Sequence, residues 1–482
     1  MTETCSHGIN IINFGKNETI SYAVVKIVGT VRLKRNIPQC PTDDTEVIVT
    51  SKQTNQQRKI RPGSNNHFKI LLQLEEGNND FRFEFGCQFE EISIKNNSLQ
   101  SEYTVTPLYI ICEGHDGTFQ GPVDQKCDIE SACNRILLCT QLLQCFSAEK
   151  LFENGLGRKT FSIENKCQIF QSKITSDDVA KMSQEELWQN IAREIMTSEI
   201  SSQKRKYLAF LSCTKYHGEL YQDSLKSHEQ LLKITDGYIA LGGGGLALFG
   251  TACLYTWPEN FDNILIKFTD ETPVDKKNFL DDSCYRGTLG ACFSTTLGSV
   301  LHELYHTFNL GHTEKGIMGR GFDNIQNFFV MDSVELKSEE IAKNFQNQIE
   351  FKEEFEPNKL SERLLNENKR KEYNVIKKLQ DDSTILTKSC AVMLCYHKWF
   401  NFGSSTRYTL IYDKNSKFIR STEGIRVVEL RSEKDELILY DWTFESKVLK
   451  FWFQIPAEVF KDKRIFILVV EDNWGNILKQ II

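Results

Sequence analysis

Short runs of alternating apolar and polar residues cover most of the first hundred positions. Two examples are SYAVVKIVGTVRL, which begins at Ser21, and FKILLQLEEGNNDFRFEF, which begins at Phe68. A period of two residues, interrupted by Gly, Asn and Pro, predicts strands that bury one face. The Gly-Asn-Asn sequence inside the second run predicts a hairpin turn. Residues 1–100 are therefore expected to form an antiparallel β-sandwich.

Strand and helix patterns interleave in the middle of the chain. The runs TPLYIICEG and KYLAFLSCTKY are apolar enough for buried strands, and residues 129–153 read as a helix. A second helix is predicted after Ser183, because Ser-Gln-Glu-Glu forms a capping box and an apolar stripe follows at Leu187, Ile191 and Ile195. The runs LALFGTACLYTW and NILIKFTD predict further strands. Residues 101–332 therefore read as an α/β domain.

The last third of the chain changes character twice. Residues 333–383 are densely charged with both signs, which predicts a solvated helical connector. Apolar runs then return and predict strands: CAVMLCYHKWF, RYTLIYD, RVVELRS, ELILYDWTF, LKFWFQIP and RIFILVVEDNWGNIL. Residues 384–482 are expected to form a second β-sandwich of two sheets. The chain thus reads as a multidomain α+β protein, with an α/β domain flanked by two β-sandwich domains, the first immunoglobulin-like.

Composition and charge exclude several kinds of partner. At 482 residues, with 40% apolar and 26% charged residues, the chain is an ordinary globular protein of roughly three domains. A net charge of −7 without a long basic block argues against binding of nucleic acid. The uncharged stretch 237–258 could cross a bilayer as a helix, but four consecutive glycines from Gly242 disfavour that helix. We expect an irregular glycine loop there and no stable membrane insertion.

The N-terminal sequence and the cysteines bear on the compartment. Residues 1–20 lack a basic segment followed by an unbroken apolar one, so no secretory signal is predicted. Fifteen cysteines without a C-x-x-C pair are expected to be mostly reduced and buried. A cytoplasmic location follows as the expectation.

Three of the nine histidines fall within eleven residues, in HELYHTFNLGH. The apolar positions around them recur with the spacing of an amphipathic helix, at Leu297, Leu301, Leu304 and Phe308. On such a helix His302 and His306 lie on one face and can bind one metal ion, with Glu303 beside the first of them. Neutral histidine nitrogens suit zinc, and a catalytic zinc site uses three protein ligands and leaves one position to water.

The third histidine requires a break in this helix. His312 follows His306 by six residues, which is too far for the same helix face unless the chain turns back. Asn309 can supply the turn, because Asn is the non-glycine residue that most readily adopts the left-handed conformation at a helix end. Met318 follows six residues after the third histidine, in GIMG.

The complete pattern resembles the signature of the metzincin clan of zinc metallopeptidases, H-E-x-x-H-x-x-G-x-x-H followed by a turn that carries methionine. It departs at one position, where Asn309 replaces the usual glycine. The longer stretch HELYHTFNLGHTEKGIMGRGFDN also resembles a family of zinc metalloproteinases found in fungi and animals.

This resemblance implies roles for particular residues. His302, His306 and His312 would hold one zinc ion per chain, Glu303 would be the general base, and Met318 would form the Met-turn. The run LALFGTACLYTW would be the strand that pairs with extended substrate. Residues 319–329 would wall the pocket beyond the scissile bond.

The leading hypothesis is a zinc metalloendopeptidase, with aminopeptidase-like hydrolysis also open, that acts on a peptide or protein through a zinc-activated water. A structural zinc site and a chance occurrence of the motif are alternatives. Another is a catalytically inactive zinc-containing binding or scaffolding protein that works through its terminal β-sandwiches, where a protein partner could bind. A gluzincin would instead take its third ligand from Glu335 or Glu339.

Overall fold

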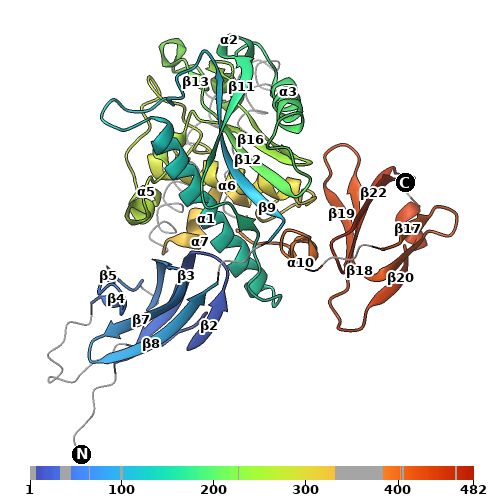
Figure 1. The fold of residues 1–482 in the computed structure, drawn as a ribbon, viewed down its shortest axis with the longest axis horizontal. Coiled ribbons are helices and arrows are strands. Elements are labelled where there is room, and N and C mark those ends of the chain that lie inside the picture. The colour runs from blue at the N-terminus through green and yellow to red at the C-terminus, as the bar shows by residue number, and fades with distance from the viewer. Residues whose placement is uncertain are drawn as a thin grey trace, which may run out of the picture. The chain divides into compact units, whose positions relative to one another are not determined.

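The computed structural model describes residues 7–32, 45–63, 66–97, 101–225, 227–331, 384–401, 403, 407–461 and 464–482. The chain divides into two compact units, one of residues 1–98 and 326–383 and the other of residues 99–325 and 384–482. Figure 1 shows the helices and strands of both units. The predicted connector at 333–383, with Glu335 and Glu339, lies outside the described residues.

The first unit contains two β-sheets. The smaller has the strand order β1 (Gly8–Ile11), β3 (Val24–Arg32) and β6 (His67–Gln73). The larger has the order β2 (Asn17–Ile20), β8 (Gln88–Asn96), β7 (Gly77–Phe85), β4 (Val47–Ser51) and β5 (Gln57–Ile60). The buried rings of Phe68 on β6 and Phe83 on β7 lie 6.3 Å apart between centroids. The inward faces of the two sheets therefore share one apolar core.

The hairpin predicted within FKILLQLEEGNNDFRFEF is wrong. Strands β6 and β7 belong to different sheets, and Gly77 and the two asparagines after it are already part of β7. Asn79 closes the connection instead: its Oδ1 accepts the Glu75 amide and its Nδ2 donates to the Glu75 carbonyl, both at 2.9 Å. The hairpin forms one strand later, between β7 and β8, where Gly86 has a φ of 58°.

A six-stranded mixed sheet lies at the centre of the second unit. Its order is β10 (Ser162–Ile163), β9 (Thr104–Glu113), β12 (Arg205–Leu211), β16 (Leu246–Gly250) and β15 (Ala240–Gly243), with β11 (Gln168–Thr175) also paired to β9. Strands β9, β12 and β16 run parallel, and β15 runs antiparallel to β16 at the edge. Parallel strands covered on both faces read as continuous apolar runs, which explains TPLYIICEG and KYLAFLS.

Helices cover both faces of this sheet (Figure 1). On one face, α3 (Gln184–Met196) packs its apolar stripe, Leu187, Ile191 and Ile195, into the core. On the other face lie α1 (Ile129–Glu153) and α6 (Leu289–Thr307). The hydroxyls of Ser147 on α1 and Tyr305 on α6 are 2.9 Å apart and hydrogen-bonded. Helix α6 carries the histidine motif, so the sheet and α1 together hold that motif in place.

Two predicted strands are helices. The run NILIKFTD contains α5 (Ile264–Phe268), and CAVMLCYHKWF contains α10 (Lys388–Tyr396). In α10 every residue from Ser389 to Cys395 is buried. A short helix buried on all sides shows no 3.6-residue period, so the sequence does not distinguish it from a buried strand.

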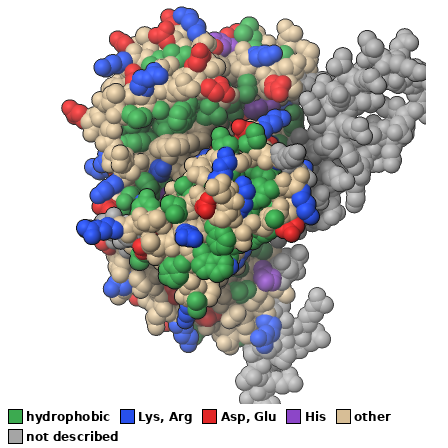
Figure 2. Space-filling model, turned by 90° about the vertical axis from the view of Figure 1, so that its right-hand side faces the viewer, with side chains coloured by type: hydrophobic (Ala, Val, Ile, Leu, Met, Phe, Trp, Pro, Cys, Tyr) green, Lys and Arg blue, Asp and Glu red, His purple; other side chains and the backbone are tan. Residues whose placement is uncertain are grey.

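The C-terminal strands form one hydrogen-bonded sheet rather than the two separate sheets expected. The order is β17 (Leu410–Asp413), β18 (Phe418–Ser432), β21 (Phe466–Asp472) and β22 (Ile477–Ile481), and β18 also pairs with β19 (Ile438–Thr443) and β20 (Lys450–Gln454). The reason is the length of β18, whose two halves pair with different strands around register shifts. Exposed apolar side chains lie on these strands, among them Ile411, Phe451 and Trp452, and Figure 2 looks onto this side of the molecule.

The remaining elements are short. They are α2 (Ser176–Val179), α4 (His228–Leu232), α7 (Gln326–Phe329), β13 (Lys215–Tyr216), β14 (Thr235–Asp236) and the 3-10 helices Gly218–Leu220, Leu254–Thr256, Phe261–Asn263, Gly321–Asn324 and Ala457–Phe460. Within the described ranges no helix has the length and apolar character needed to cross a membrane. The cysteines of those same ranges form no disulfide.

Candidate metal centre

The C-terminal turns of α6 bring the first two histidines together. The helix begins after Thr288, whose hydroxyl accepts the Ala291 amide, and ends at Thr307. His302 and His306 lie one turn apart and face the same side, with ring centroids 4.7 Å apart. The four-residue spacing of His302 and His306 therefore produces the contact that was predicted from it.

The break after α6 returns the third histidine to the same point. Asn309 has a φ of 63°, the left-handed conformation that its sequence position predicts. The Leu310 amide donates to the Tyr305 carbonyl at 3.2 Å and closes the end of the helix. The chain then doubles back, and the ring centroid of His312 lies 4.6 Å from that of His306.

The three imidazoles point one nitrogen each toward a common centre. The Nε2 atom of His306 is 3.1 Å from Nε2 of His302 and 3.1 Å from Nε2 of His312. All three atoms lie within 4.8 Å of one another. Nitrogens that hold one zinc ion at roughly 2.0–2.1 Å in tetrahedral directions are about 3.3 Å apart. The cluster therefore has the size of a zinc site.

The other nitrogen of each ring is held by a backbone carbonyl. Nδ1 of His302 donates to Ile317 O at 2.8 Å, and Nδ1 of His306 donates to Leu310 O at 2.9 Å. Nδ1 of His312 donates to Asp435 O at 2.5 Å. With the proton on Nδ1, each Nε2 presents a lone pair to the centre, which is the tautomer that a metal ligand needs.

Burial keeps the helical histidines neutral. Loss of solvent, together with a smaller contribution from the neighbouring His306, lowers the pKa of His302 to about 3. Burial likewise lowers the pKa of His306 to about 4. Both imidazoles are therefore unprotonated on Nε2 at neutral pH, and no proton has to leave before a metal ion binds.

Glu303 follows His302 on α6 and is not a member of the three-histidine cluster. Its Oε2 accepts the Gly242 amide at 2.8 Å. Burial raises the pKa of the Glu303 carboxyl to about 7, although the hydrogen bond from Gly242 lowers it in part. A carboxyl group that titrates near neutral pH is suited to accept and release a proton.

The strand next to Glu303 is β15, not the strand that the sequence indicated. The run LALFGTACLYTW forms β16, which is interior because it pairs with β12 and β15, followed by a short 3-10 helix. The edge strand comes from the glycine stretch that we expected to be an irregular loop. Gly242 is needed there, because a Cβ atom would collide with the Glu303 backbone. The strand can approach α6 this closely only with glycine at that position.

The segment after the third histidine packs under the cluster. Met318 is buried, and the preceding residue, Ile317, supplies the carbonyl that holds His302. The ring of Phe322 lies 5.2 Å from the His302 ring, edge to face. Ile317, next to the predicted Met-turn residue, and Phe322, in the predicted pocket wall at 319–329, therefore both contact His302.

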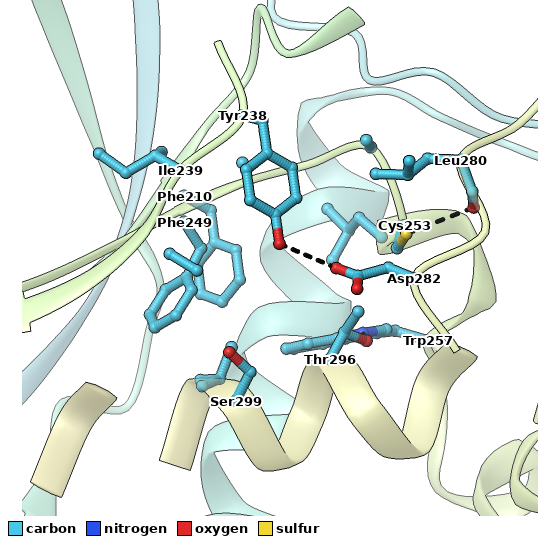
Figure 3. Close-up of a pocket in the computed structure, with 15 residues that line it drawn as sticks. Phe210, Tyr238, Ile239, Phe249, Cys253, Trp257, Leu280, Asp282, Thr296 and Ser299 are labelled. Carbon is cyan, nitrogen blue, oxygen red and sulfur yellow. Dashed lines mark hydrogen bonds between the residues drawn. The ribbon is translucent and has the colours of Figure 1, made fainter. Parts of the chain in front are cut away.

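A small cavity of about 40 Å³ lies one helical turn before the motif (Figure 3). Thr296 and Ser299 of α6 line it, together with aromatic residues of the sheet. At one end the Tyr238 hydroxyl donates to Asp282 at 3.1 Å. This volume holds about one water molecule, so the cavity does not accept a substrate side chain without rearrangement.

Residues of the C-terminal sheet also contact this site, and sequence reasoning did not predict them. The His312 amide donates to Glu436 O at 3.1 Å, and the Ile438 amide donates to His312 O at 2.9 Å. Arg431 reaches the Asn309 carbonyl at 2.6 Å. Two of these contacts are made by the backbone of the β18–β19 connection, which leaves no side-chain pattern. The available signal was the alternation of Glu429 and Arg431 within an otherwise apolar strand.

Three convergent histidine nitrogens form a candidate site for one metal ion. The model of a family described as "Putative peptidase family" matches residues 8–388. The chain therefore belongs to this peptidase family.

Two yeast proteins are similar to much of the chain. "Putative zinc metalloproteinase YIL108W" of Saccharomyces cerevisiae is 24% identical over 306 residues, which are 56% of this chain and 42% of the yeast protein. "Putative zinc metalloproteinase C607.06c" of Schizosaccharomyces pombe is 23% identical over 336 residues, 64% and 52% of the two chains. The chain thus spans about half the length of the curated relatives it matches.

Among solved structures, the chain is similar to catalytically inactive OgpA from Akkermansia muciniphila in complex with an O-glycopeptide substrate, glycodrosocin. The identity is 11% and the TM-score 0.41, over 80% of this chain and 93% of that chain.

Proposed function

We propose that this chain is a zinc-dependent metallopeptidase of the metzincin type that hydrolyses internal peptide bonds of peptides or proteins. His302, His306 and His312 hold one zinc ion, and Glu303 is the general base. The observation that carries this proposal is the convergence of three Nε2 lone pairs, with Glu303 next to His302 on the same helix. The names of the two yeast relatives support zinc as the metal.

Glu303 is the residue that transfers protons in this reaction. Zinc, when bound by the histidines, supplies a Lewis acid that lowers the pKa of water toward 7 and polarises the scissile carbonyl. As a carboxylate, Glu303 can accept the proton of the attacking water and pass it to the leaving amine. The hydrogen bond from Gly242 orients the carboxyl for this transfer.

The edge strand β15 is the proposed substrate-binding element. An extended peptide can add to a sheet edge through backbone hydrogen bonds, and β15 is the edge beside Glu303. Backbone pairing does not require a free amino or carboxyl terminus on the substrate. This favours an endopeptidase over an aminopeptidase.

The histidine motif also supports a more specific assignment of the fold. The left-handed Asn309 in the glycine position and the buried Met318 support a metzincin-type domain. A protein partner bound through the terminal sheets and a cytoplasmic location remain predictions, whereas the strands of 384–482 form one sheet in place of the predicted two-sheet sandwich.

The direct test uses purified protein and a peptide library derived from a proteome. We expect about one zinc ion per chain by elemental analysis and cleavage at internal bonds, detected by mass spectrometry. Glu303→Gln should retain zinc and lose cleavage, because it keeps the shape of the side chain but removes the base. The matched control is Glu314→Gln, a change at an exposed carboxyl in the loop after His312.

Two results would contradict the proposal. One is stoichiometric zinc with no turnover above the Glu303→Gln variant, which favours the scaffolding alternative. The other is cleavage confined to the terminal residue of each peptide, which replaces the endopeptidase by an exopeptidase.

A further inference from the structure

The third histidine of the metal centre is held from the C-terminal sheet. Its ring donates to Asp435 O, its amide donates to Glu436 O, and its carbonyl accepts the Ile438 amide. The backbone of His312 thus forms a parallel bridge beside Leu437, at the connection between β18 and β19. This connection lies beyond residue 388, where the match to the peptidase family ends.

The side chain of Arg431 bonds both the segment before His312 and the β18–β19 connection. Arg431 of β18 has no exposed surface, and its Nη2 donates to the Asn309 carbonyl at 2.6 Å. Its Nη1 donates to Glu436 Oε2 at 3.1 Å. Asn309 is the helix break that precedes His312, and Glu436 is the residue whose carbonyl receives the His312 amide. A single guanidinium therefore fixes the two segments between which the third histidine lies.

The packing around the guanidinium is close. A Cβ atom at Gly311 would come within 2.7 Å of Arg431 Nε and 2.8 Å of Glu436 O. Glu429, two residues earlier on β18, balances the charge with a 2.5 Å contact from its Oε2 to Arg431 Nη2. Lys479 binds the second oxygen of Glu436 at 2.7 Å. The loop that carries His312 thus lies on a cluster of charged side chains, Glu429, Arg431, Glu436 and Lys479.

A buried ion pair of this kind is a poor source of stability. Removing two charged groups from water costs several kcal/mol, and well-packed apolar residues often serve as well or better. Its effect on geometry is different, because a planar guanidinium with several directed donors fixes the groups that it bonds. The contacts of Arg431 are directed at the loop of the metal centre.

We propose that Arg431 is a positioning residue for the third metal ligand, so that the C-terminal sheet is an integral part of the metal centre. This inference rests on the proposed function in one respect, namely that the three histidines bind a metal ion. Groups that orient a ligand without touching the metal typically change metal affinity by roughly 10- to 100-fold.

The test compares metal binding in the full chain and its variants. Arg431→Lys keeps the charge but loses the fork of donors. The double change Glu429→Met and Arg431→Met removes the pair together and leaves no buried unpaired charge, so it keeps the test possible if Arg431→Lys does not fold. The matched control is Arg426→Lys, because Arg426 is also buried on β18 and also bonds backbone carbonyls, those of Phe444 and Ser446.

Zinc affinity is measured by competition with a chelator, and ligand geometry by the visible absorption of the cobalt(II)-substituted protein. We expect both Arg431 variants to bind zinc roughly 10- to 100-fold more weakly and to show an altered cobalt spectrum, with Arg426→Lys like the parent. Folded Arg431 variants with parental affinity and spectrum would overturn the positioning role alone. A parent protein that binds no zinc would overturn the metal site itself, and this proposal with it.

Discussion

Helix α6 and the loop after it hold the histidines of the candidate metal site in different ways. The carbonyls that fix His302 and His306 lie 15 and 4 residues from them along the chain. The carbonyl that fixes His312 lies 123 residues away. The first two ligands are thus placed by the helix and the turn that follows it, whereas the third depends on a distant sheet.

The three histidines are therefore positioned by two kinds of interaction, one local and one tertiary. The identity and spacing of the ligands are local, because a helix places residues i and i+4 on one face wherever it occurs. The orientation of the loop ligand is tertiary, because Arg431 and the β18–β19 connection must first be in place. Changes in the helix and changes in the loop should therefore have distinguishable effects.

The largest effect should follow from loss of a ligand. His302→Ala, His306→Ala and His312→Ala should each reduce zinc affinity by more than the roughly 100-fold expected of a supporting group. Elemental analysis after dialysis measures the effect. If His312→Ala retained full zinc, the third ligand would lie elsewhere, and Glu335→Ala and Glu339→Ala would be the next variants to measure.

The next effect concerns the contact between α6 and β15. Gly242→Ala should push the edge strand away from Glu303, because the added Cβ meets the helix backbone. A displacement near 1 Å in a catalytic group can cost roughly 100-fold in rate, while zinc content should stay near one per chain. The neighbouring Gly243→Ala is the matched control, since a Cβ there meets nothing within 4 Å. Equal activity of the two variants would show that the close approach has no catalytic role.

A smaller effect is expected from the loop. Gly311→Ala brings a Cβ against Arg431 and the Glu436 carbonyl, so the loop must shift and His312 with it. We expect zinc affinity to fall roughly 10-fold, measured by chelator competition. Gly245→Ala serves as the comparison, because the nearest atom to its Cβ is 4.0 Å away. Parental affinity in Gly311→Ala would mean that the loop tolerates movement without loss of the ligand.

The smallest effect concerns the stability of the C-terminal sheet. Burial, with Asp472 and Glu429 nearby, raises the pKa of Glu471 well above its usual 4.5. The folded state therefore binds this proton more tightly than the unfolded state. Stability contributed by protonated Glu471 is present below pH 4.5 and is lost as pH rises toward the raised pKa.

Glu471→Gln should remove this loss, because its amide carries no charge at any pH. We expect the variant to be more stable than the parent at pH 7, because folding of the parent at this pH must either bind a proton or bury a charge at Glu471. The gain should shrink as the pH falls toward 4.5. Thermal unfolding of the parent and the variant across this range measures it, and a difference independent of pH would rule out the ionisation as its cause.

The sequence predicted the parts of the centre that depend on local chemistry. The span of α1, the capping box at Ser183, the helix with two histidines and the left-handed Asn309 all follow from short-range patterns. The edge strand β15 was missed, because GGGG reads as a loop unless the approach of Glu303 is known. The short helices α5 and α10 were missed because burial on every side removes their period.

The contacts between the C-terminal sheet and the loop that carries His312 could not be predicted from the sequence. The carbonyls of Asp435 and Glu436 carry no side-chain signal, since every residue has a carbonyl group. Only the charged pair on β18, Glu429 and Arg431, marked an inward face that is not purely apolar. A charged pair in a strand indicates a buried contact, but it does not identify what the contact holds.

Glu303 is proposed to carry out proton transfer at a zinc site. The most direct measurement compares kcat and KM of Glu303→Ala with those of the parent at equal zinc occupancy. We expect zinc content and KM to stay near parental values and kcat to fall by roughly 10²- to 10⁴-fold, because the base acts in the transition state. A Glu303→Ala protein with full zinc and a kcat within a few fold of the parent would contradict the account and leave the three histidines as a structural metal site.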